Sequence, residues 1–549
     1  MPGEPHPLNL ILILGGYGTF GGRIAHRAAA LGFDVLVAGR SLAKAQGFCK
    51  GTDRLTPIAL ARADLAQALA THRPFALVDA AGPFQGSDYT IARAAAAAGC
   101  HYLDIADASS FVAGISALDP EAQAASISIL SGASSVPALS HAVALDLADG
   151  LTSVTAIEMA LSASSRGTAG RSVTAAILSY IGRPVPLRRG AREAHAFGWQ
   201  ELRRVTFRAA PAPPLTRRLT AIADVPDLTL LPDRLPGRPS VTFHAGTDAP
   251  WHNLGLWLLS WPVRWGWLKR LERFAALLSA LQRWTRGPGS ARSAFEIRLF
   301  GLAGTRRVER SWTLLPERCE GPEIPTLAVP LLLARLAQGA LPPGARDAGG
   351  LLTLADFQPS LTALATVQQR REHELPPPVY ARVMGDRFAA LPLAVRRMHE
   401  VLRDGGACGE AEVTRGTNPL ARLAATAFRF PPAGRHRLHV AFTERDGIER
   451  WTRDFGGRRF HSHLSARGQH IVERFGPLRF AFALPSNARG LRMVMERWWI
   501  GPLPLPLALG PKSEASEWEE AGRFHFDVPI ALPLIGKVVH YRGWLEPAR

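Results

Sequence analysis

A run of apolar residues followed by three closely spaced glycines, within residues 8–22, constrains the fold of this chain more than any other feature. Residues 8–14 are typical of a buried strand, and the glycines that follow have the spacing G-x-G-x-x-G. Such glycines allow a tight turn, close approach of the backbone to a pyrophosphate, and close packing of the next helix, whose N-terminus attracts phosphate. We therefore predict a dinucleotide-binding turn rather than a plain glycine-rich turn. Its cofactor contacts are expected from Gly16, Gly18, Thr19, Phe20 and Gly21.

The second predicted strand and its end, residues 34–41, close with Arg40 and Ser41. Where such a strand binds NAD it ends in an acidic residue that bonds the ribose 2′-hydroxyl, whereas an arginine accommodates the 2′-phosphate of NADP. Lys44 lies one helical turn further on and adds positive charge. We therefore predict NADP as the cofactor, the alternative being that Arg40 is a solvated charge at a strand end.

Strands alternate with helices through residues 1–150, which predicts an α/β Rossmann domain with a doubly wound parallel sheet. Asp64 follows the third strand, where its carboxylate could accept from the adenine amino group or cap the next helix. The fourth strand ends in small residues, which leave room for the cofactor to cross the strand ends. These residues, also predicted to bind the cofactor, are Ala81, Gly82 and Pro83.

Five landmarks follow one another through this region. They are the glycine turn, Ala38-Gly39-Arg40-Ser41, Asp79-Ala80-Ala81-Gly82-Pro83-Phe84, His101-Tyr102-Leu103-Asp104 and Gly132-Ala133-Ser134-Ser135-Val136-Pro137. Together they resemble the NADP-binding domain of the saccharopine dehydrogenase-like family. The resemblance implies a nicotinamide cofactor and the reduction of an imine, a carbonyl or an activated double bond. The short-chain dehydrogenases share the fold but need a Tyr-x-x-x-Lys pair, and none of the five lysines here has tyrosine four positions before it.

Hydride transfer also needs a protein that orients the substrate and supplies a proton donor. Ligands of such sheets bind at strand ends. Polar residues near the predicted strand ends, taken as candidate catalytic residues, are Tyr89, His101, Asp107 and Ser134. Arg166 and Arg171 are candidates to clamp a substrate carboxylate.

Residues 151–360 mix strand and helix patterns. In the resembled family a domain of this kind supplies the substrate wall and often the dimer surface, so we expect an α+β substrate and homodimerisation domain. Residues 322–340 are expected to pack back on the Rossmann domain.

The tryptophans between Trp251 and Trp284 lie among leucines and basic residues. A basic, tryptophan-rich amphipathic stretch is typical of a segment in a membrane interface, so peripheral membrane contact is one interpretation. The alternative is a core helix pair over the substrate pocket or at a dimer seam, which would favour an apolar substrate. The uncharged run 249–263 is shorter than the ~20 residues that cross a bilayer.

Residues 361–378 are polar and end in three prolines, which predicts a linker. Residues 379–549 then read as an amphipathic helix from Tyr380 to Leu402 and, beyond Gly409, strand patterns that suggest a mainly antiparallel β-barrel or half-barrel. This part resembles an uncharacterised bacterial domain family found behind saccharopine dehydrogenase-like modules, which implies an architecture but no activity. The residues that carry the resemblance are Arg415-Gly416, Glu449-Arg450-Trp451-Thr452-Arg453-Asp454-Phe455, Phe460-His461-Ser462, Glu496-Arg497-Trp498 and His540-Tyr541-Arg542-Gly543-Trp544.

Two ligand hypotheses concern this barrel. His461 and His463 share one face of a strand. They could begin a metal site, which one of three further histidines would complete: His439, His525 or His540. Histidines bonded to carboxylates or solvent are commoner, so we predict no metal. An apolar or amphiphilic ligand is the other hypothesis, with a lining of Trp451, Phe455, Phe460, Trp498 and Tyr541.

The net charge is +18, and 59 of the 64 basic residues are arginine. Codon bias of a GC-rich bacterial genome explains this excess, and attraction to anionic small molecules or lipid headgroups is the alternative. No nucleic-acid module is recognisable. The four cysteines are far apart and no leader is evident, so we expect a cytoplasmic protein, with peripheral contact at the inner membrane face left open.

We therefore expect an NADP(H)-dependent oxidoreductase that acts on a small-molecule or lipid-like substrate. The alternative is a non-catalytic NADP-binding sensor or scaffold whose C-terminal barrel binds an apolar ligand.

Overall fold

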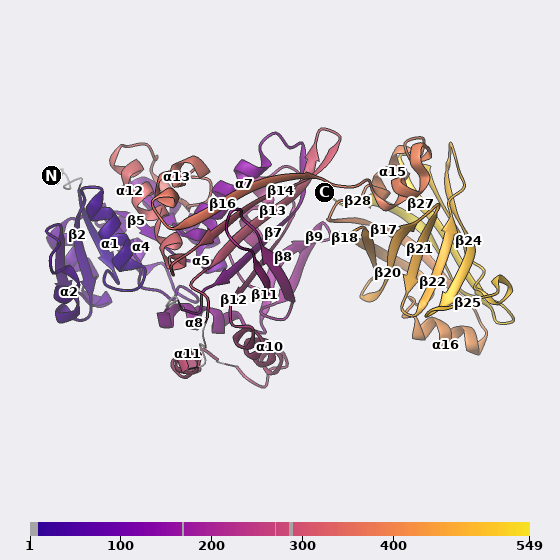
Figure 1. The fold of residues 1–549 in the computed structure, drawn as a ribbon, viewed down its shortest axis with the longest axis horizontal. Coiled ribbons are helices and arrows are strands. Elements are labelled where there is room, and N and C mark those ends of the chain that lie inside the picture. Colours follow the sequence, from indigo (N-terminus) through magenta and orange to yellow (C-terminus); the bar gives the residue numbers. More distant parts are fainter. Residues whose placement is uncertain (1–8, 167–169, 270, 285–288, 549) are drawn as a thin grey trace.

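The computed structural model describes residues 9–166, 170–269, 271–284 and 289–548, and its described residues form three large sheets that follow one another along the chain (Figure 1). The first is parallel, the second is mixed, and the third closes into an antiparallel barrel. This arrangement confirms the predicted fold class.

The first sheet has the strand order β15-β6-β5-β4-β1-β2-β3. β1 pairs with both β2 and β4, so the strand order reverses beside it, which is where ligands bind in sheets of this kind. Its apolar strands are buried on both faces because helices cover them. The elements are β1 (Leu10–Leu14), α1 (Gly21–Ala30), β2 (Asp34–Gly39), α2 (Leu42–Cys49), β3 (Leu55–Ala59), α3 (Leu65–His72), β4 (Ala76–Asp79), α4 (Thr90–Ala97), β5 (His101–Asp104), α5 (Ser109–Gly114), α6 (Asp119–Ala124), β6 (Ser128–Ser131) and α7 (Ser140–Ala148).

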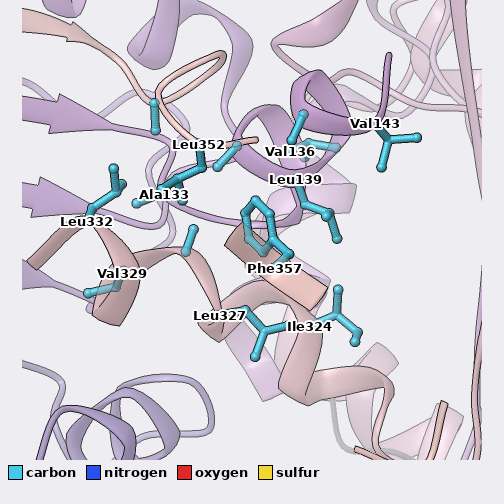
Figure 2. Close-up of a cluster of buried hydrophobic side chains, with 14 of the residues drawn as sticks. Ala133, Val136, Leu139, Val143, Ile324, Leu327, Val329, Leu332, Leu352 and Phe357 are labelled. Carbon is cyan, nitrogen blue, oxygen red and sulfur yellow. The ribbon is translucent and has the colours of Figure 1, made fainter. Parts of the chain in front are cut away.

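A segment far along the chain returns to this sheet. β15 (Gly344–Asp347) pairs in parallel with β6, although the sequence analysis ended the sheet at residue 150. The helices on either side of it, α12 (Ala328–Ala337) and α13 (Leu354–Thr362), pack against the loop after β6 and against α7. Figure 2 shows Leu332 and Phe357 of these helices beside Ala133 and Leu139. Residues from the end of the second domain therefore extend the first sheet beside β6 and pack on the loop that follows this strand.

The second sheet has the order β10-β11-β12-β7-β13-β14-β16. Its last strand corrects the predicted linker, because residues 366–374 form β16 and pair antiparallel with β14. β16 is an edge strand in which no residue is buried, which explains the polar sequence that suggested a linker. The elements are β7 (Ser153–Ala163), α8 (Gly170–Tyr180), β8 (Pro184–Arg189), β9 (Arg192–Phe197), β10 (Leu202–Phe207), β11 (Leu215–Ile222), α9 (Asp227–Leu230), β12 (Ser240–Thr247), α10 (Pro250–Arg264), α11 (Ala275–Trp284), β13 (Ala294–Ala303), β14 (Arg306–Pro316) and β16 (Thr366–Glu374).

The third sheet closes where β22 pairs with β24. The helix expected from Tyr380 to Leu402 is broken into two, because Gly385 has a φ of 58° and Pro392 precedes the second helix. The elements are α14 (Val379–Met384), α15 (Leu393–His399), β17 (Asp404–Arg415), α16 (Pro419–Ala427), β18 (Gly434–Arg445), β19 (Ile448–Phe455), β20 (Arg458–Arg467), β21 (His470–Phe475), β22 (Leu478–Ala483), β23 (Ser486–Asn487), β24 (Gly490–Ile500), β25 (Leu503–Leu505), β26 (Glu514–Glu520), β27 (Arg523–Leu532) and β28 (Gly536–Pro547).

Candidate functional site

The glycine turn between β1 and α1 has no room for a side chain at Gly18 or Gly21. A Cβ atom on Gly21 would lie 2.2 Å from the carbonyl oxygen of Gly15, and one on Gly18 would lie 3.0 Å from the same atom. The Gly18 amide donates to Gly15 O at 2.8 Å, which closes the turn. A turn this tight lets the backbone approach a ligand closely, as a pyrophosphate cradle requires.

The N-terminus of α1 is open. Phe20 precedes the helix without a side-chain cap, and the first turn contains no acidic residue. Thr19 and Phe20 are both partly exposed. Because helix N-terminal N–H groups carry a partial positive charge, this end suits the phosphates of a dinucleotide.

The end of β2 presents two basic side chains to solvent, because Arg40 and Lys44 are both exposed. Ser41 caps α2, since its Oγ accepts from the Lys44 amide at 3.4 Å. The ring of Tyr17 covers Gly39, where a Cβ would lie 2.2 Å from the ring, and the Tyr17 hydroxyl accepts from the Ser41 amide at 3.2 Å. Tyr17 was not among the predicted site residues, although it lies inside the glycine motif.

The end of β4 is held by polar contacts to its backbone. Asp79 Oδ1 accepts from the Ala81 amide at 2.9 Å, and Arg62 Nη2 donates to Ala81 O at 2.8 Å. From the second domain, Ser172 Oγ on α8 donates to Gly82 O at 3.2 Å, so this helix touches the predicted cofactor loop. Gly82 is partly exposed and Pro83 is exposed. Asp64 is exposed and makes no side-chain cap to α3, so the capping alternative for it is wrong.

The four candidate catalytic residues do not gather in one place. His101 is the first residue of β5 and thus lies at the amino edge, where its Nδ1 accepts from the Ser128 amide at 2.9 Å. It is wrong as a catalytic candidate, because ligands of parallel sheets bind at the carboxyl edge. Tyr89 donates its hydroxyl hydrogen to Phe111 O at 2.9 Å and is thereby committed to the backbone. Ser134 follows β6 and is buried.

Asp107 lies beyond the carboxyl end of β5. Its charge acts on two residues of the second domain, Asp224 and Tyr180, that were not predicted from the sequence. Asp107 Oδ1 accepts from Gln85 Nε2 at 3.0 Å. In the second domain, Asp224 accepts from Ser109 Oγ at 2.6 Å. Burial raises the pKa of Asp107, and burial together with the nearby Asp107 charge raises the pKa of Asp224.

Tyr180, at the end of α8, completes this group. Burial raises the pKa of its hydroxyl well above the ordinary value, and the charges of Asp107 and Asp224 add to the shift. The charges of two carboxyl groups, one from each domain, therefore act on this phenol, and all three residues are partly exposed. Titratable groups whose pKa values are raised in this way are candidates for proton transfer.

Asp104, the last residue of β5, has a structural part in the site. It is fully buried, and its Oδ1 accepts from the Gly132 amide at 2.8 Å and from the Ala106 amide at 2.9 Å. Burial raises its pKa to about 7 in spite of these bonds. Asp104 thus fixes the loops that follow β5 and β6, which carry Asp107 and Ser134.

The barrel interior is a packed core. All five residues expected to line a ligand pocket (Trp451, Phe455, Phe460, Trp498 and Tyr541) are at most 7% exposed. Phe455 contacts Phe460 and Tyr541 at ring-centroid distances of 5.7 and 5.8 Å. Tyr380 of α14 and Met398 of α15 belong to the same cluster. The space that was expected to hold an apolar ligand is therefore filled by the barrel's own side chains.

The barrel histidines point to different partners. His439 Nε2 contacts Gly190 O at 2.8 Å, and His540 Nε2 contacts Asp527 Oδ1. His461 and His463 contact each other with ring centroids 5.5 Å apart. Among the residues that the structure describes, no group of three or more histidines, cysteines or acidic residues is arranged to hold a metal ion.

Of the two arginines proposed to clamp a substrate carboxylate, Arg166 is exposed. The side chain of Arg171 lies outside what the structure describes. In the described part of the chain, no helix is both long enough and apolar enough to cross a membrane.

Comparison with known proteins identifies the two ends of the chain. Residues 11–130 match the model of the saccharopine dehydrogenase NADP binding domain. Residues 391–545 match the model of a domain of unknown function, DUF4166. Both matches confirm the resemblances found in the sequence, and no curated protein matches the chain.

Several solved structures are similar to this chain. Saccharopine dehydrogenase (L-Glu forming) from Saccharomyces cerevisiae is 13% identical with a TM-score of 0.45, over 66% of this chain and 100% of that one. Amine dehydrogenase from Mycobacterium smegmatis is 12% identical with a TM-score of 0.35, over 64% of this chain and 97% of that one. The Bordetella bronchiseptica enzyme WbmH, solved with NAD+, is 19% identical with a TM-score of 0.15, over 17% of this chain and 38% of that one.

The match of the first domain supports an oxidoreductase that uses a nicotinamide dinucleotide. The glycine turn and the open N-terminus of α1 fit such a group, because a side chain on Gly21 would collide with the turn that cradles it.

Proposed function

We propose that the protein is an NADP(H)-dependent oxidoreductase that transfers hydride to or from an imine, carbonyl or enoyl group of a small or lipid-like substrate. The observation that carries this proposal is the group formed by Asp107, Asp224 and Tyr180. It joins the carboxyl edge of the Rossmann sheet to the second domain, where the Ser172–Gly82 contact also lies. Acids with raised pKa values at this place suit the proton transfer that accompanies reduction.

The choice of NADP rests on the end of β2. Arg40 is exposed there, and its guanidinium forms no ion pair or hydrogen bond with the described part of the chain, so it is available to a 2′-phosphate. Lys44 is exposed on the first turn of α2 and adds a second positive charge. When bound, the nicotinamide supplies or accepts the hydride.

The acid pair supplies the proton that accompanies reduction. Two nearby carboxyl groups in a buried setting resist double ionisation, so one of them keeps a proton at a higher pH than an ordinary acid does. Asp107 and Asp224 can therefore give a proton to a nitrogen or oxygen of the substrate, or take one back in the reverse reaction. Gln85 and Ser109 orient the two carboxyl groups through their hydrogen bonds.

Turnover of NADPH tests the proposal. The full-length protein is assayed for NADPH oxidation by absorbance against a panel of imines, ketones and enoyl thioesters, and NADPH binding is titrated by fluorescence. We expect turnover with at least one class, and a loss of ~100-fold or more for Asp107→Asn at unchanged NADPH affinity. Asp53→Asn, at an exposed acid of the same domain, is the matched control. Tight NADPH binding without turnover on every class would instead favour the sensor or scaffold.

A further inference from the structure

Helix α10 of the second domain presents an apolar face to the outside. Trp251, Leu254 and Leu258 are 51%, 44% and 62% exposed, and Trp265 at the helix end is 56% exposed. Their spacings of three, four and seven residues place them on the same side of the helix. The proposed reaction uses none of these side chains.

The opposite side of α10 holds the polar residues of the helix. Asn253 and Ser260 are fully buried. Asn253 donates from Nδ2 to Leu219 O at 2.8 Å and accepts at Oδ1 from the Thr247 amide at 3.1 Å. An ordinary surface helix has its polar side toward water and its apolar side toward the core. Here polar bonds attach the helix to the domain and apolar groups face outward, so this face is suited to an apolar medium.

The same surface continues through the following turn into α11. Trp267, Phe274, Leu277 and Trp284 are 75%, 50%, 65% and 85% exposed. The rings of Trp265 and Trp267 lie 5.1 Å apart between centroids, so the patch is continuous across the turn. Figure 1 shows α10 and α11 on the same side of the second domain. We call the exposed apolar side chains of residues 251–284 the tryptophan face.

Basic groups accompany the tryptophan face. Arg264, Lys269 and Arg273 are exposed. In sequence, residues 249–284 contain five basic residues and one acidic residue. Tryptophan and leucine beside lysine and arginine are the combination found where helices lie in the interface of a bilayer with anionic lipids.

We propose that the tryptophan face binds the surface of an anionic lipid bilayer. Its tryptophan and leucine side chains enter the interfacial region, and Lys269 and Arg273 contact lipid phosphates. A second copy of the chain is a poorer occupant, because a two-fold interface sets the same patch against itself. Basic groups would then face basic groups with one acidic residue on each side to offset them.

The tryptophan face belongs to helices that pack against the end of α8, the helix that borders the candidate site. The inner sides of α10 and α11 pack, through Trp257 and Leu278, against the cluster that contains Leu178 and Ile181 at the end of α8. The same helix carries Tyr180 and touches Gly82 through Ser172. Membrane binding therefore brings the proposed substrate wall close to the bilayer. The access of a lipid-like substrate from the bilayer rests on the proposed function, whereas the membrane contact does not.

Vesicle flotation tests the contact without any cofactor or substrate. The full-length protein is floated with vesicles of phosphatidylcholine and phosphatidylglycerol, and separately with phosphatidylcholine alone. We expect flotation with the anionic vesicles that weakens as salt is raised. The double variant Leu258→Gln with Trp267→Gln should lower partitioning about tenfold or more, because both side chains lose their burial in the interface. Lys269→Glu with Arg273→Glu should lower it about tenfold at low salt.

The matched control is Leu423→Gln on α16, where the leucine is 67% exposed on the barrel domain and should not matter. Both apolar targets are mostly exposed, so the variants should fold, which circular dichroism verifies. The proposal is overturned if the wild type stays with the unfloated fraction, or if the apolar double variant floats as well as the wild type. It is also overturned if light scattering shows a wild-type dimer that this variant converts to monomers while neither binds vesicles.

Discussion

Ser109 at the start of α5 donates a hydrogen bond of 2.6 Å to Asp224 Oδ1, and this bond joins the Rossmann domain to the second domain. Asp107 lies two residues before Ser109, so the bond also keeps the two acids together. Burial raises the pKa of each acid, and the charge of Asp107 raises that of Asp224 further. The raised pKa of Asp224 thus depends in part on a residue of the other domain.

The first prediction concerns the pH dependence of reduction. Because the pKa values are raised, the pair holds its proton to a higher pH than free aspartate does, and the protonated form is the one that can donate. The value of kcat/KM for reduction should therefore fall as pH rises through the raised pKa. Asp107→Asn should remove this fall and lower the rate about 100-fold or more. A pH profile of NADPH oxidation measures both, and an unchanged profile would remove Asp107 from the reaction.

The second prediction compares two glycines of the same domain. Gly21→Ala places a Cβ 2.2 Å from Gly15 O, so the turn must open and we expect NADPH affinity to fall about 100-fold or more. Gly47→Ala in α2 meets no atom within 4 Å and should stabilise the domain by up to ~1 kcal/mol, because alanine favours helix. Fluorescence titration of NADPH and thermal unfolding of both variants provide the measurements. Equal affinities for the two variants would contradict the cradle.

The third prediction separates NADPH from NADH. Arg40→Ser removes the guanidinium expected to contact the 2′-phosphate, so the Kd for NADPH should rise about 10- to 100-fold while that for NADH changes little. Lys50→Ser, an exposed charge at the far end of α2, should leave both unchanged. A parallel loss for both dinucleotides would mean that Arg40 acts on the fold of the turn and not on the phosphate.

The first and third sheets could be predicted because their signals are local. The strands β1, β2 and β4 of the Rossmann sheet contain apolar runs, and most barrel strands are separated by turns that contain Gly or Pro. β15 has the sequence Gly-Ala-Arg-Asp, which carries no strand signal, and it joins the first sheet only through its long-range pairing with β6. β16 was not predicted because an edge strand without buried residues has the same polar composition as a linker.

In the candidate site, too, the residues of one local motif could be predicted, whereas those brought together by long-range packing could not. The glycine turn and Arg40 belong to one continuous motif, so the sequence was sufficient to place them. Asp224 and Tyr180 belong to a different domain from Asp107, and only the packing of α8 and of the segment after β11 brings them to it. His101 was misplaced because it lies at the amino end of its strand, whereas ligands of a parallel sheet bind at the carboxyl ends.

Glu158 of β7 ties the second sheet to the barrel. Its carboxylate accepts from Arg403 Nε at 3.0 Å and from Arg403 Nη2 at 2.8 Å, and Arg445 Nη2 adds a bond of 2.9 Å. Arg203 and Arg298 lie within 3.9 Å of the same carboxylate. Burial alone would raise the pKa of Glu158, but the bonds and charges of these arginines hold it at about 2, below its usual 4.5.

The fourth prediction follows from this lowered pKa. The ionised carboxylate contributes stability that is fully present above pH 4.5 and is lost as pH falls through about 2. Glu158→Gln should therefore lower the free energy of unfolding near neutral pH by roughly 3 kcal/mol, and the difference from wild type should shrink as the solution is acidified. Urea unfolding at several pH values measures this, with Glu412→Gln, an exposed acid on β17, as the control. If Glu158→Gln costs no more than the control at neutral pH, the arginine cluster does not hold the barrel against the second sheet.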